Sequence, residues 1–355
     1  MAKAGKKKLS KAGRVIRVLI VLAIAGILFG ISDLYRVVYY PNVDLKEKAN
    51  TFIFIPSNAR YEDVLKILAD SKILISLSSF EWVASRLGYR EHVHPGKYLV
   101  KKNMSNKDLV VMLRSGRQTP VKLTFNNIRT KDQLASRLSH ELEPDSLQIM
   151  SMLNDSQYLS KYSFNPETVM AMFIPNTYEI YWNTSADALF SKMFKEYTKF
   201  WSQENNIEKA KEIGLTPVQV SILASIVEQE THRNDEKSIV AGVYMNRLNK
   251  GYRLEADPTL VFALGDFTIK RVLNAYKELD SPYNTYKYEG LPPGPICMSS
   301  ISSLKAVLNY TRHDYFFFCA KEDFSGYHTF AKSYEEHLKN ARRYQKELNK
   351  RNIKI

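Results

Sequence analysis

Two glutamates, Glu228 and Glu230, stand in the segment ASIVEQET, where residue types and spacing could support acid catalysis. Apolar residues at helical spacing, Leu223, Ile226 and Val227, share one predicted helix face with Glu230. Glu228 falls about 200° around the same helix. A carboxyl group that loses contact with water keeps its proton to higher pH and can then act as a general acid. Glu230 is therefore the candidate acid, and the alternative is a helix-end glutamate paired with a nearby Lys or Arg.

The helix that must position the candidate acid has explicit start signals. Thr216 and Gln219 have the spacing of a capping box, and Pro217 occupies the first helical position. We therefore expect a helix that begins at Pro217 and carries Glu230 on its apolar face.

The simplest role for Glu228 is structural, because an ion pair with Arg247 or Lys237 would fix the helix. Arg247 has two explanations of its own. Its planar guanidinium could bind a substrate carboxylate, or it could pair with Glu228 or Asp257. Asp257 precedes Pro258, so we expect it to cap a helix, and a second carboxylate near the reacting bond of a substrate is the alternative.

A polar and aromatic cluster without apolar periodicity is formed by Tyr283, Asn284, Thr285 and Tyr286. Aromatic rings stack on sugar rings and amides bond sugar hydroxyls, so the cluster is a candidate sugar contact. A turn that packs its own tyrosines is the alternative. His328 is expected to be a satisfied hydrogen-bonding residue, with a substrate contact as the alternative. No metal site is predicted, because the histidine spacing near the candidate acid does not follow H-E-x-x-H.

Six segments in sequence order carry a family resemblance: ASIVEQET, VAGVYMNRL, RLEADPT, SPYNTY, GLPPGPI and YHTF. Together they closely resemble the endolytic murein transglycosylase family, also called YceG-like. The resemblance implies cleavage of peptidoglycan glycan strands between N-acetylmuramic acid and N-acetylglucosamine, with Glu230 as the catalytic glutamate and no cofactor. The 6-hydroxyl of the sugar would attack its own anomeric carbon, so a 1,6-anhydro end forms without a second protein carboxylate. Two rival functions stay open, a non-catalytic peptidoglycan-binding scaffold and a muramidase that uses water.

The amino terminus combines a basic flank with an apolar run. The chain carries 51 Lys and Arg against 37 Asp and Glu, a formal charge of +14, and half of this excess lies in the first seventeen residues. Nucleic acid is not an expected partner, because no helix-turn-helix, zinc-finger or RNA-binding signature is present. Residues 1–14 are expected to stay in the cytoplasm and residues 15–40 to anchor the chain in the membrane, with Tyr35, Tyr39 and Tyr40 at the interface. A cleaved signal peptide is the alternative, because the apolar run is short for a span of about 20 residues.

The exported remainder is expected to have an α+β fold. A β-α-α-β order over about fifty residues is similar to LysM-type glycan-binding modules, and residues 45–120 are assigned to such a module. Residues 121–165 are expected to connect it to a catalytic domain at residues 166–350. The expected location is the inner (plasma) membrane, and the resemblance implies contact with peptidoglycan-synthesis enzymes. The sequence leaves open whether Cys297 and Cys319 pair.

Overall fold

The structure is a computed structural model that describes residues 11–125, 128–269 and 271–351. The chain divides into two compact units. One holds the chain up to Val121 together with Tyr181–Asn183, and the other holds Lys122–Ile180 and the chain from Thr184 onward. Helices and short strands occur in both units, so the predicted α+β fold class is confirmed. The finer limits predicted from the sequence stay a prediction.

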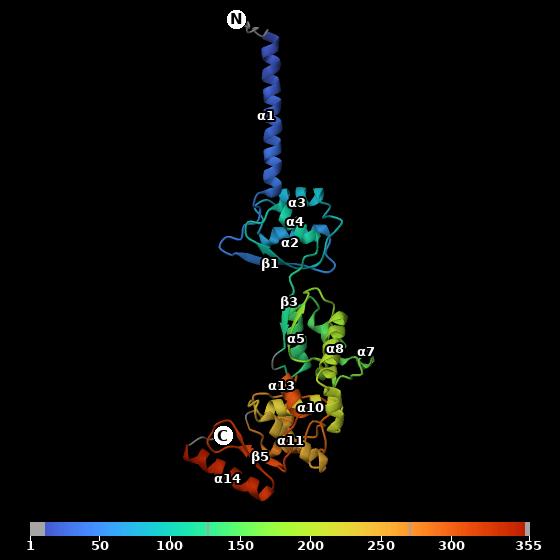
Figure 1. The fold of residues 1–355 in the computed structure, drawn as a ribbon, viewed down its shortest axis with the longest axis vertical. Coiled ribbons are helices and arrows are strands. Elements are labelled where there is room, and N and C mark those ends of the chain that lie inside the picture. The colour runs from blue at the N-terminus through green and yellow to red at the C-terminus, as the bar shows by residue number, and fades with distance from the viewer. Residues whose placement is uncertain (1–10, 126–127, 270, 352–355) are drawn as a thin grey trace, which may run out of the picture. The chain divides into compact units, whose positions relative to one another are not determined.

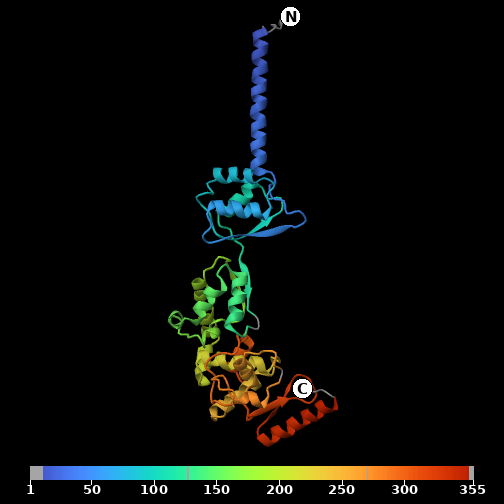
Figure 2. The ribbon, with the colours of Figure 1, turned by 180° about the vertical axis from the view of Figure 1, so that it is seen from behind.

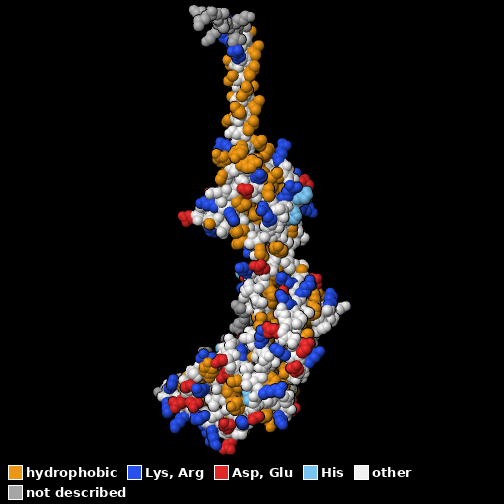
Figure 3. Space-filling view, in the orientation of Figure 1, with side chains coloured by type: hydrophobic (Ala, Val, Ile, Leu, Met, Phe, Trp, Pro, Cys, Tyr) orange, Lys and Arg blue, Asp and Glu red, His pale blue; other side chains and the backbone are white. Residues whose placement is uncertain are grey.

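Helix α1 (Lys11–Tyr39) is long and apolar enough to cross a membrane. Its 29 residues span about 43 Å at 1.5 Å per residue, against a hydrocarbon layer of about 30 Å. Its most apolar stretch has a mean hydropathy of 2.6 and is not buried in the protein. Figure 3 shows hydrophobic side chains along most of its exposed surface. The helix therefore fits a single-pass anchor, and most of the predicted basic tail, residues 1–14, lies outside the described residues.

The rest of the first unit is a two-stranded sheet with three helices. Its elements in chain order are β1 (Asn50–Ile55), α2 (Tyr61–Ser71), α3 (Leu77–Arg86), β2 (Gly96–Lys101) and α4 (Asn106–Arg114). The two strands pair antiparallel, from Asn50 opposite Lys101 to Ile55 opposite Gly96. The sheet lies on one side of this unit and the helices on the other (Figures 1 and 2). The β-α-α-β order is therefore present, and the LysM-like identity of the module stays a prediction.

Two buried asparagines tie the end of α1 to this unit. Asn42 bonds both backbone groups of Ser76, the N-cap of α3, and donates to Asn106 Oδ1 at 2.6 Å. Asn106 in turn donates to the Val37 carbonyl oxygen in α1 at 2.9 Å. A buried and well-bonded amide pair specifies one geometry, so the C-terminal end of α1 is fixed to α3 and α4.

The second unit is mainly helical and contains two two-stranded sheets within the described residues. Its elements in chain order are β3 (Val121–Thr124), α5 (Lys131–Glu141), α6 (Ser146–Asn154), α7 (Ser156–Ser160), the 3₁₀ helix η1 (Val169–Met172), β4 (Thr177–Ile180), α8 (Ala186–Ser202), α9 (Asn206–Glu212), α10 (Pro217–Glu230), α11 (Lys237–Asn249), α12 (Asp257–Leu264), η2 (Asn274–Glu278), α13 (Ile301–Leu308), β5 (Phe317–Ala320), β6 (His328–Ala331) and α14 (Tyr334–Lys350). Strand β3 pairs with β4, and β5 pairs antiparallel with β6. Helix α14 packs on the β5–β6 hairpin (Figure 1). Helix α10 is the centre of the unit, because it contacts α9, α11, α12, α13 and η1.

Gly294, in the GLPPGPI segment, lies where a side chain has no room. A Cβ atom there would stand 1.9 Å from the Glu167 carbonyl oxygen. Gly294→Ala must therefore push two backbone segments apart, and we expect it to lower the free energy of unfolding by about 3 kcal/mol or more, the upper end of overpacking costs. Thermal unfolding of the detergent-solubilised chain measures this loss.

Gly214→Ala is the matched control for the steric effect. A Cβ atom at Gly214 meets no atom within 4 Å, so only its left-handed backbone, at φ 76°, opposes the change. We expect that strain to cost about 1 kcal/mol. Equal losses in the two variants would contradict the steric explanation for Gly294.

Candidate active site

Helix α10 carries Glu230 to the edge of the core. The predicted capping box is present, because Thr216 Oγ1 accepts from the Gln219 backbone N–H at 3.2 Å and Gln219 Oε1 accepts from the Thr216 N–H at 2.9 Å. Every residue in the range 220–227 is buried, so packing holds the helix on all sides. Thr231 has an extended backbone and ends the helix directly after Glu230. The candidate acid therefore lies where the chain leaves the core.

The Glu230 carboxyl can hold a proton near neutral pH. Loss of surrounding water raises its pKa, a hydrogen bond from Tyr244 lowers it, the Asp257 charge raises it and the His328 charge lowers it. The balance places the pKa of Glu230 at about 7. Tyr244 Oη donates to Glu230 Oε1 at 2.6 Å, and burial raises the pKa of Tyr244 well above its ordinary value, so the phenol stays a donor. A carboxyl group with this pKa can both donate and accept a proton at neutral pH.

Three cavities open beside Glu230, with volumes of about 270, 560 and 630 Å³. Besides Glu230, side chains from several segments line them: Arg129, Phe267 and Arg271 in the first cavity, Tyr286 and Phe316–Phe318 in the second, and Arg233, Tyr327 and His328 in the third. Each cavity contains aromatic rings, whose flat faces suit sugar rings. The carboxyl group can therefore meet a ligand that is longer than one sugar.

A buried carboxylate fixes the orientation of His328 in the third cavity. Glu236 is 3% exposed and accepts two hydrogen bonds of 2.7 Å from His328, one from its backbone N–H and one from Nδ1. Thr231, next to the candidate acid, donates to the same carboxylate at 3.1 Å. Burial alone would raise the pKa of Glu236, but these bonds and the His328 charge hold it below its ordinary value. No local sequence pattern indicates Glu236, because 92 residues separate it from the histidine.

Asp257 and Tyr286 stand together beside the candidate acid. Helix α12 begins at Asp257 itself and its N-cap is Ala256, which makes no side-chain cap, so the predicted capping role of Asp257 is wrong. Asp257 Oδ1 instead accepts a hydrogen bond of 2.5 Å from Tyr286 Oη. Asp257 lines the first and second cavities together with Glu230. The structure thus brings a second carboxylate close to the first.

Comparison with known proteins gives the family. The model of the YceG-like family matches residues 53–343. This chain belongs to that family. The family predicted from the sequence is therefore confirmed.

Individual relatives agree with the YceG-like assignment. A Bacillus subtilis protein named endolytic murein transglycosylase is 27% identical over 334 residues, which cover 90% of this chain and 91% of the relative. A Streptococcus pneumoniae protein of the same name is 26% identical over 329 residues, which cover 84% of this chain and 59% of that relative. The crystal structure of a yceG-like protein from Listeria monocytogenes has a TM-score of 0.55 at 27% identity, over 82% of this chain and 99% of that one.

Arg247 bonds other residues of this chain and so has a structural role. It is 7% exposed, and its guanidinium donates to the carbonyl oxygens of Phe316, Arg253 and Leu254 at 2.7 to 3.1 Å. Its ion-pair partner is Glu255, at 2.9 Å. The predicted pairing with Glu228 or Asp257 is therefore wrong. A substrate carboxylate would have to displace several of these bonds.

The side chains of the Tyr283–Tyr286 cluster point in different directions, some into the protein and one into a cavity. Asn284 is fully buried and donates to the carbonyl oxygens of Lys277 and Leu279 at 2.9 and 2.7 Å. Thr285 is buried as well and bonds the Ala256 backbone N–H and the Thr259 hydroxyl. Tyr283 stacks at a tilt on Phe262, with ring centres 4.8 Å apart. Tyr286 is the member of the cluster that lines a cavity with Glu230.

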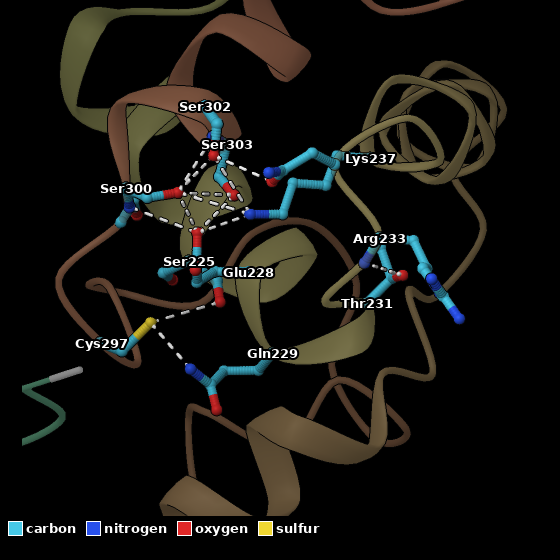
Figure 4. A network of polar contacts seen from close by, with 12 residues as sticks. Ser225, Glu228, Gln229, Thr231, Arg233, Lys237, Cys297, Ser300, Ser302 and Ser303 are labelled. Atoms are coloured by element: carbon cyan, nitrogen blue, oxygen red, sulfur yellow. Dashed lines mark hydrogen bonds and ion pairs between the residues drawn. The ribbon is translucent and has the colours of Figure 1, made fainter. Parts of the chain in front are cut away.

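Glu228 lies in a separate polar network (Figure 4). Its Oε2 pairs with Lys237 Nζ at 3.2 Å, one of the two predicted partners, and accepts from the hydroxyls of Ser300 and Ser303. Burial raises the pKa of Glu228, but the two hydroxyls and the lysine outweigh it and hold the pKa below its ordinary value. Figure 4 shows the lysine and the serines converging on Glu228, while Gln229 turns toward Cys297.

The structure also describes both cysteines and the possible metal ligands. Cys297 and Cys319 are both free, which answers the question that the sequence left open. The described ranges contain no group of three or more His, Cys, Asp or Glu side chains that could hold a metal ion.

Replacing Lys237 leaves Glu228 without its cation. The lysine side chain is 4% exposed and that of Glu228 is 23% exposed, so water can replace the lost charge only in part. We expect Lys237→Met to lower the free energy of unfolding by about 3 kcal/mol, as happens when one partner of a buried pair is removed. Because the folded-state pKa of Glu228 is depressed, this difference should shrink as the pH falls through that value.

Denaturant unfolding at neutral and acidic pH measures the loss. Lys305→Met is the control, since Lys305 and Glu204 form an exposed pair at 2.9 Å that is expected to contribute less than about 1 kcal/mol. Similar losses in the two variants would argue against a special role for the buried pair.

Proposed function

We propose that this chain is a membrane-anchored endolytic lytic transglycosylase of peptidoglycan. Its substrate is the bond between N-acetylmuramic acid and N-acetylglucosamine within a nascent strand, and its products carry 1,6-anhydromuramic ends. The observation that carries the proposal is Glu230, a carboxyl group with a pKa of about 7 beside three cavities. The names of the Bacillus and Streptococcus relatives support the same activity.

Glu230 acts first as an acid and then as a base. Its protonated carboxyl donates to the glycosidic oxygen as that oxygen leaves C1 of the muramic residue. The 6-hydroxyl of the same residue bonds to C1 and gives its proton to the ionised Glu230, which restores the acid. One C–O bond breaks and one forms, and no water is consumed. Because the nucleophile belongs to the substrate, the reaction needs no second carboxylate at a fixed distance.

The neighbours of Glu230 keep both steps accessible. Tyr244 donates to the carboxyl and favours its ionised form, whereas water loss and the Asp257 charge favour the protonated form. These opposing influences leave the pKa close to neutrality, where an acid that must also act as a base is most effective. Tyr286 and the aromatic rings of the second cavity are proposed to contact the sugars.

Asp257 favours a hydrolytic muramidase as the second candidate function. Its carboxylate lines two cavities with Glu230 and could activate a water molecule in place of the 6-hydroxyl. Mass spectrometry of the released fragments separates the candidates. Anhydro ends support the transglycosylase, reducing ends support the muramidase, and an absence of fragments supports a non-catalytic scaffold.

The long apolar helix α1 supports a membrane location for the proposed activity. We propose that α1 stays in the plasma membrane with the basic flank in the cytoplasm, as the positive-inside rule favours, so that the catalytic unit is exported. The module at residues 45–120 would hold glycan near the site and raise its local concentration. Growing strands are made at this membrane surface, so contact with peptidoglycan-synthesis enzymes is part of the proposal.

Glu230→Gln should abolish fragment release from peptidoglycan. An amide keeps the shape of the side chain but cannot donate a proton as a carboxyl group does, and loss of general acid catalysis alone costs about a hundredfold or more in rate. Mass spectrometry of digests is the measurement, with sedimentation on insoluble peptidoglycan to show that binding persists. Glu204→Gln, at an exposed ion pair, is the control. Normal release by Glu230→Gln would refute the acid assignment.

The pH profile should report the Glu230 carboxyl. Cleavage needs the protonated form, so activity should fall about tenfold per pH unit above the pKa of about 7. Tyr244→Phe removes a hydrogen bond that lowers this pKa, so we expect the alkaline limb to move to higher pH by about one unit. Initial rates between pH 5 and pH 9 measure the shift. Tyr310→Phe, at a tyrosine outside the three cavities, should leave the limb in place, and a downward shift in Tyr244→Phe would contradict the proposed balance.

A further inference from the structure

The first cavity contains two arginines that the proposed mechanism does not use. Arg129 and Arg271 both line this space of about 270 Å³, together with Glu230 and Asp257. Most of its other walls are apolar: Val261, Phe262, Phe267, Ile269, Val272 and Ile296. A small cavity with apolar walls and two guanidinium groups suits an anion that is attached to a short apolar chain.

Backbone hydrogen bonds, rather than an ion pair of its guanidinium, fix the position of Arg129. The Ile128 carbonyl oxygen accepts from the Met298 backbone N–H at 2.8 Å, and the Arg129 N–H donates to Gln133 Oε1 at 2.8 Å. The guanidinium carbon lies 5.0 Å from the centre of the Phe267 ring. Within residues 11–125, 128–269 and 271–351, no carboxylate forms an ion pair with Arg129. A guanidinium carries five N–H donors, so Arg129 can bond an acceptor that enters the cavity.

Arg247 shows the opposite arrangement. Its guanidinium already donates to three carbonyl oxygens and to Glu255. The substrate carboxylate that the sequence analysis considered for Arg247 therefore finds a better partner in Arg129. Asp257, on the wall of the same cavity, repels an anion and restricts it to the arginine side.

The chemistry of peptidoglycan supplies a matching group. The muramic residue carries a lactyl ether next to the reacting ring, and the stem peptide begins there with an alanine and continues with an acidic residue. A ligand whose C1 lies at Glu230 thus brings a methyl-bearing segment and then a carboxylate into its neighbourhood. Guanidinium and carboxylate groups pair through two parallel hydrogen bonds, which gives direction as well as affinity.

We propose that the first cavity is a stem-peptide subsite, in which Arg129 and Arg271 bind a carboxylate of the peptide on the muramic residue being cleaved. The inference rests on the proposed function and adds a substrate requirement to it. Strands that carry peptides with free carboxylates are the preferred substrate. Strands without peptides, which expose only the lactyl carboxylate, and strands with amidated stem carboxylates are poor substrates.

The test compares these three kinds of strand as substrates of the full-length chain in detergent. On strands with free stem carboxylates, Arg129→Gln should lower kcat/KM by about ten- to hundredfold, mainly through KM, because a hydrogen bond to a charged partner is lost. On stripped or amidated strands the same variant should match the wild type. Arg129→Lys keeps the charge but loses the planar fork, so an intermediate value is expected. Arg271→Gln should show the same selectivity.

Arg137→Gln is the matched control, because Arg137 lies on α5 in an ion pair with Glu141 and lines none of the three cavities. It should leave all three substrates unchanged, and the unfolding temperature of each variant shows that it is folded. Equal cleavage of the three substrates by the wild type would overturn the subsite, as would an equal loss on all of them in folded Arg129→Gln. Either result leaves the proposed function standing, whereas a wild type that releases no fragments from any strand removes the function itself.

Discussion

A carboxyl group that burial shields from much of the surrounding water, at the end of a helix with a buried core, is the constraint on which the candidate site depends. Loss of water disfavours the ionised form of Glu230, and the C-terminal end of α10 acts in the same direction, because the last carbonyl oxygens of a helix carry partial negative charge. The hydrogen bond from Tyr244 offsets part of this cost. Since α10 is buried from Val220 to Val227, packing fixes the position from which Glu230 reaches the cavities.

The two glutamates at the end of α10 show how environment separates equal side chains. Glu228 receives two hydroxyls and the ammonium group of Lys237, so its pKa falls, whereas Glu230 receives one phenol and its pKa rises. The start of α11 serves both arrangements. Its first residue is Lys237, and the preceding residue, Glu236, orients His328 in the third cavity. The adjacent residues Glu236 and Lys237 therefore have two roles. Lys237 fixes α10 through its ion pair with Glu228, and Glu236 holds His328 beside the candidate acid Glu230.

Local sequence patterns predict helix α10 and its candidate acid, but they do not predict the partners of these side chains. The capping box at Thr216 is a short-range signal, so the start of α10 follows from the sequence. The sequence pattern places Glu230 on an apolar helix face and Glu228 about 200° away from it. In the structure the middle of α10 is buried on all sides, and Glu228 is also bonded inside the protein, so this difference between the two faces is smaller than predicted. Arg247 turns to Glu255, which adopts a left-handed backbone at φ 52° that its residue type does not announce. Pairs that are distant in the chain, such as Glu236 with His328, require the tertiary fold.

An internal cut in a polymer requires that the chain can pass the acid on both sides. A site that acts on strand ends needs one closed side, which would stop the terminal sugar. Glu230 borders three cavities with different linings. The first is lined by α12 and the segment after it, the second by β5 and Tyr286, and the third by the chain that precedes β6. The sugars on either side of the broken bond can therefore occupy different cavities, and the stem peptide can take the one that holds Arg129. In the proposed mechanism one carboxyl group suffices, because the substrate would be held from several directions while its own hydroxyl completes the reaction.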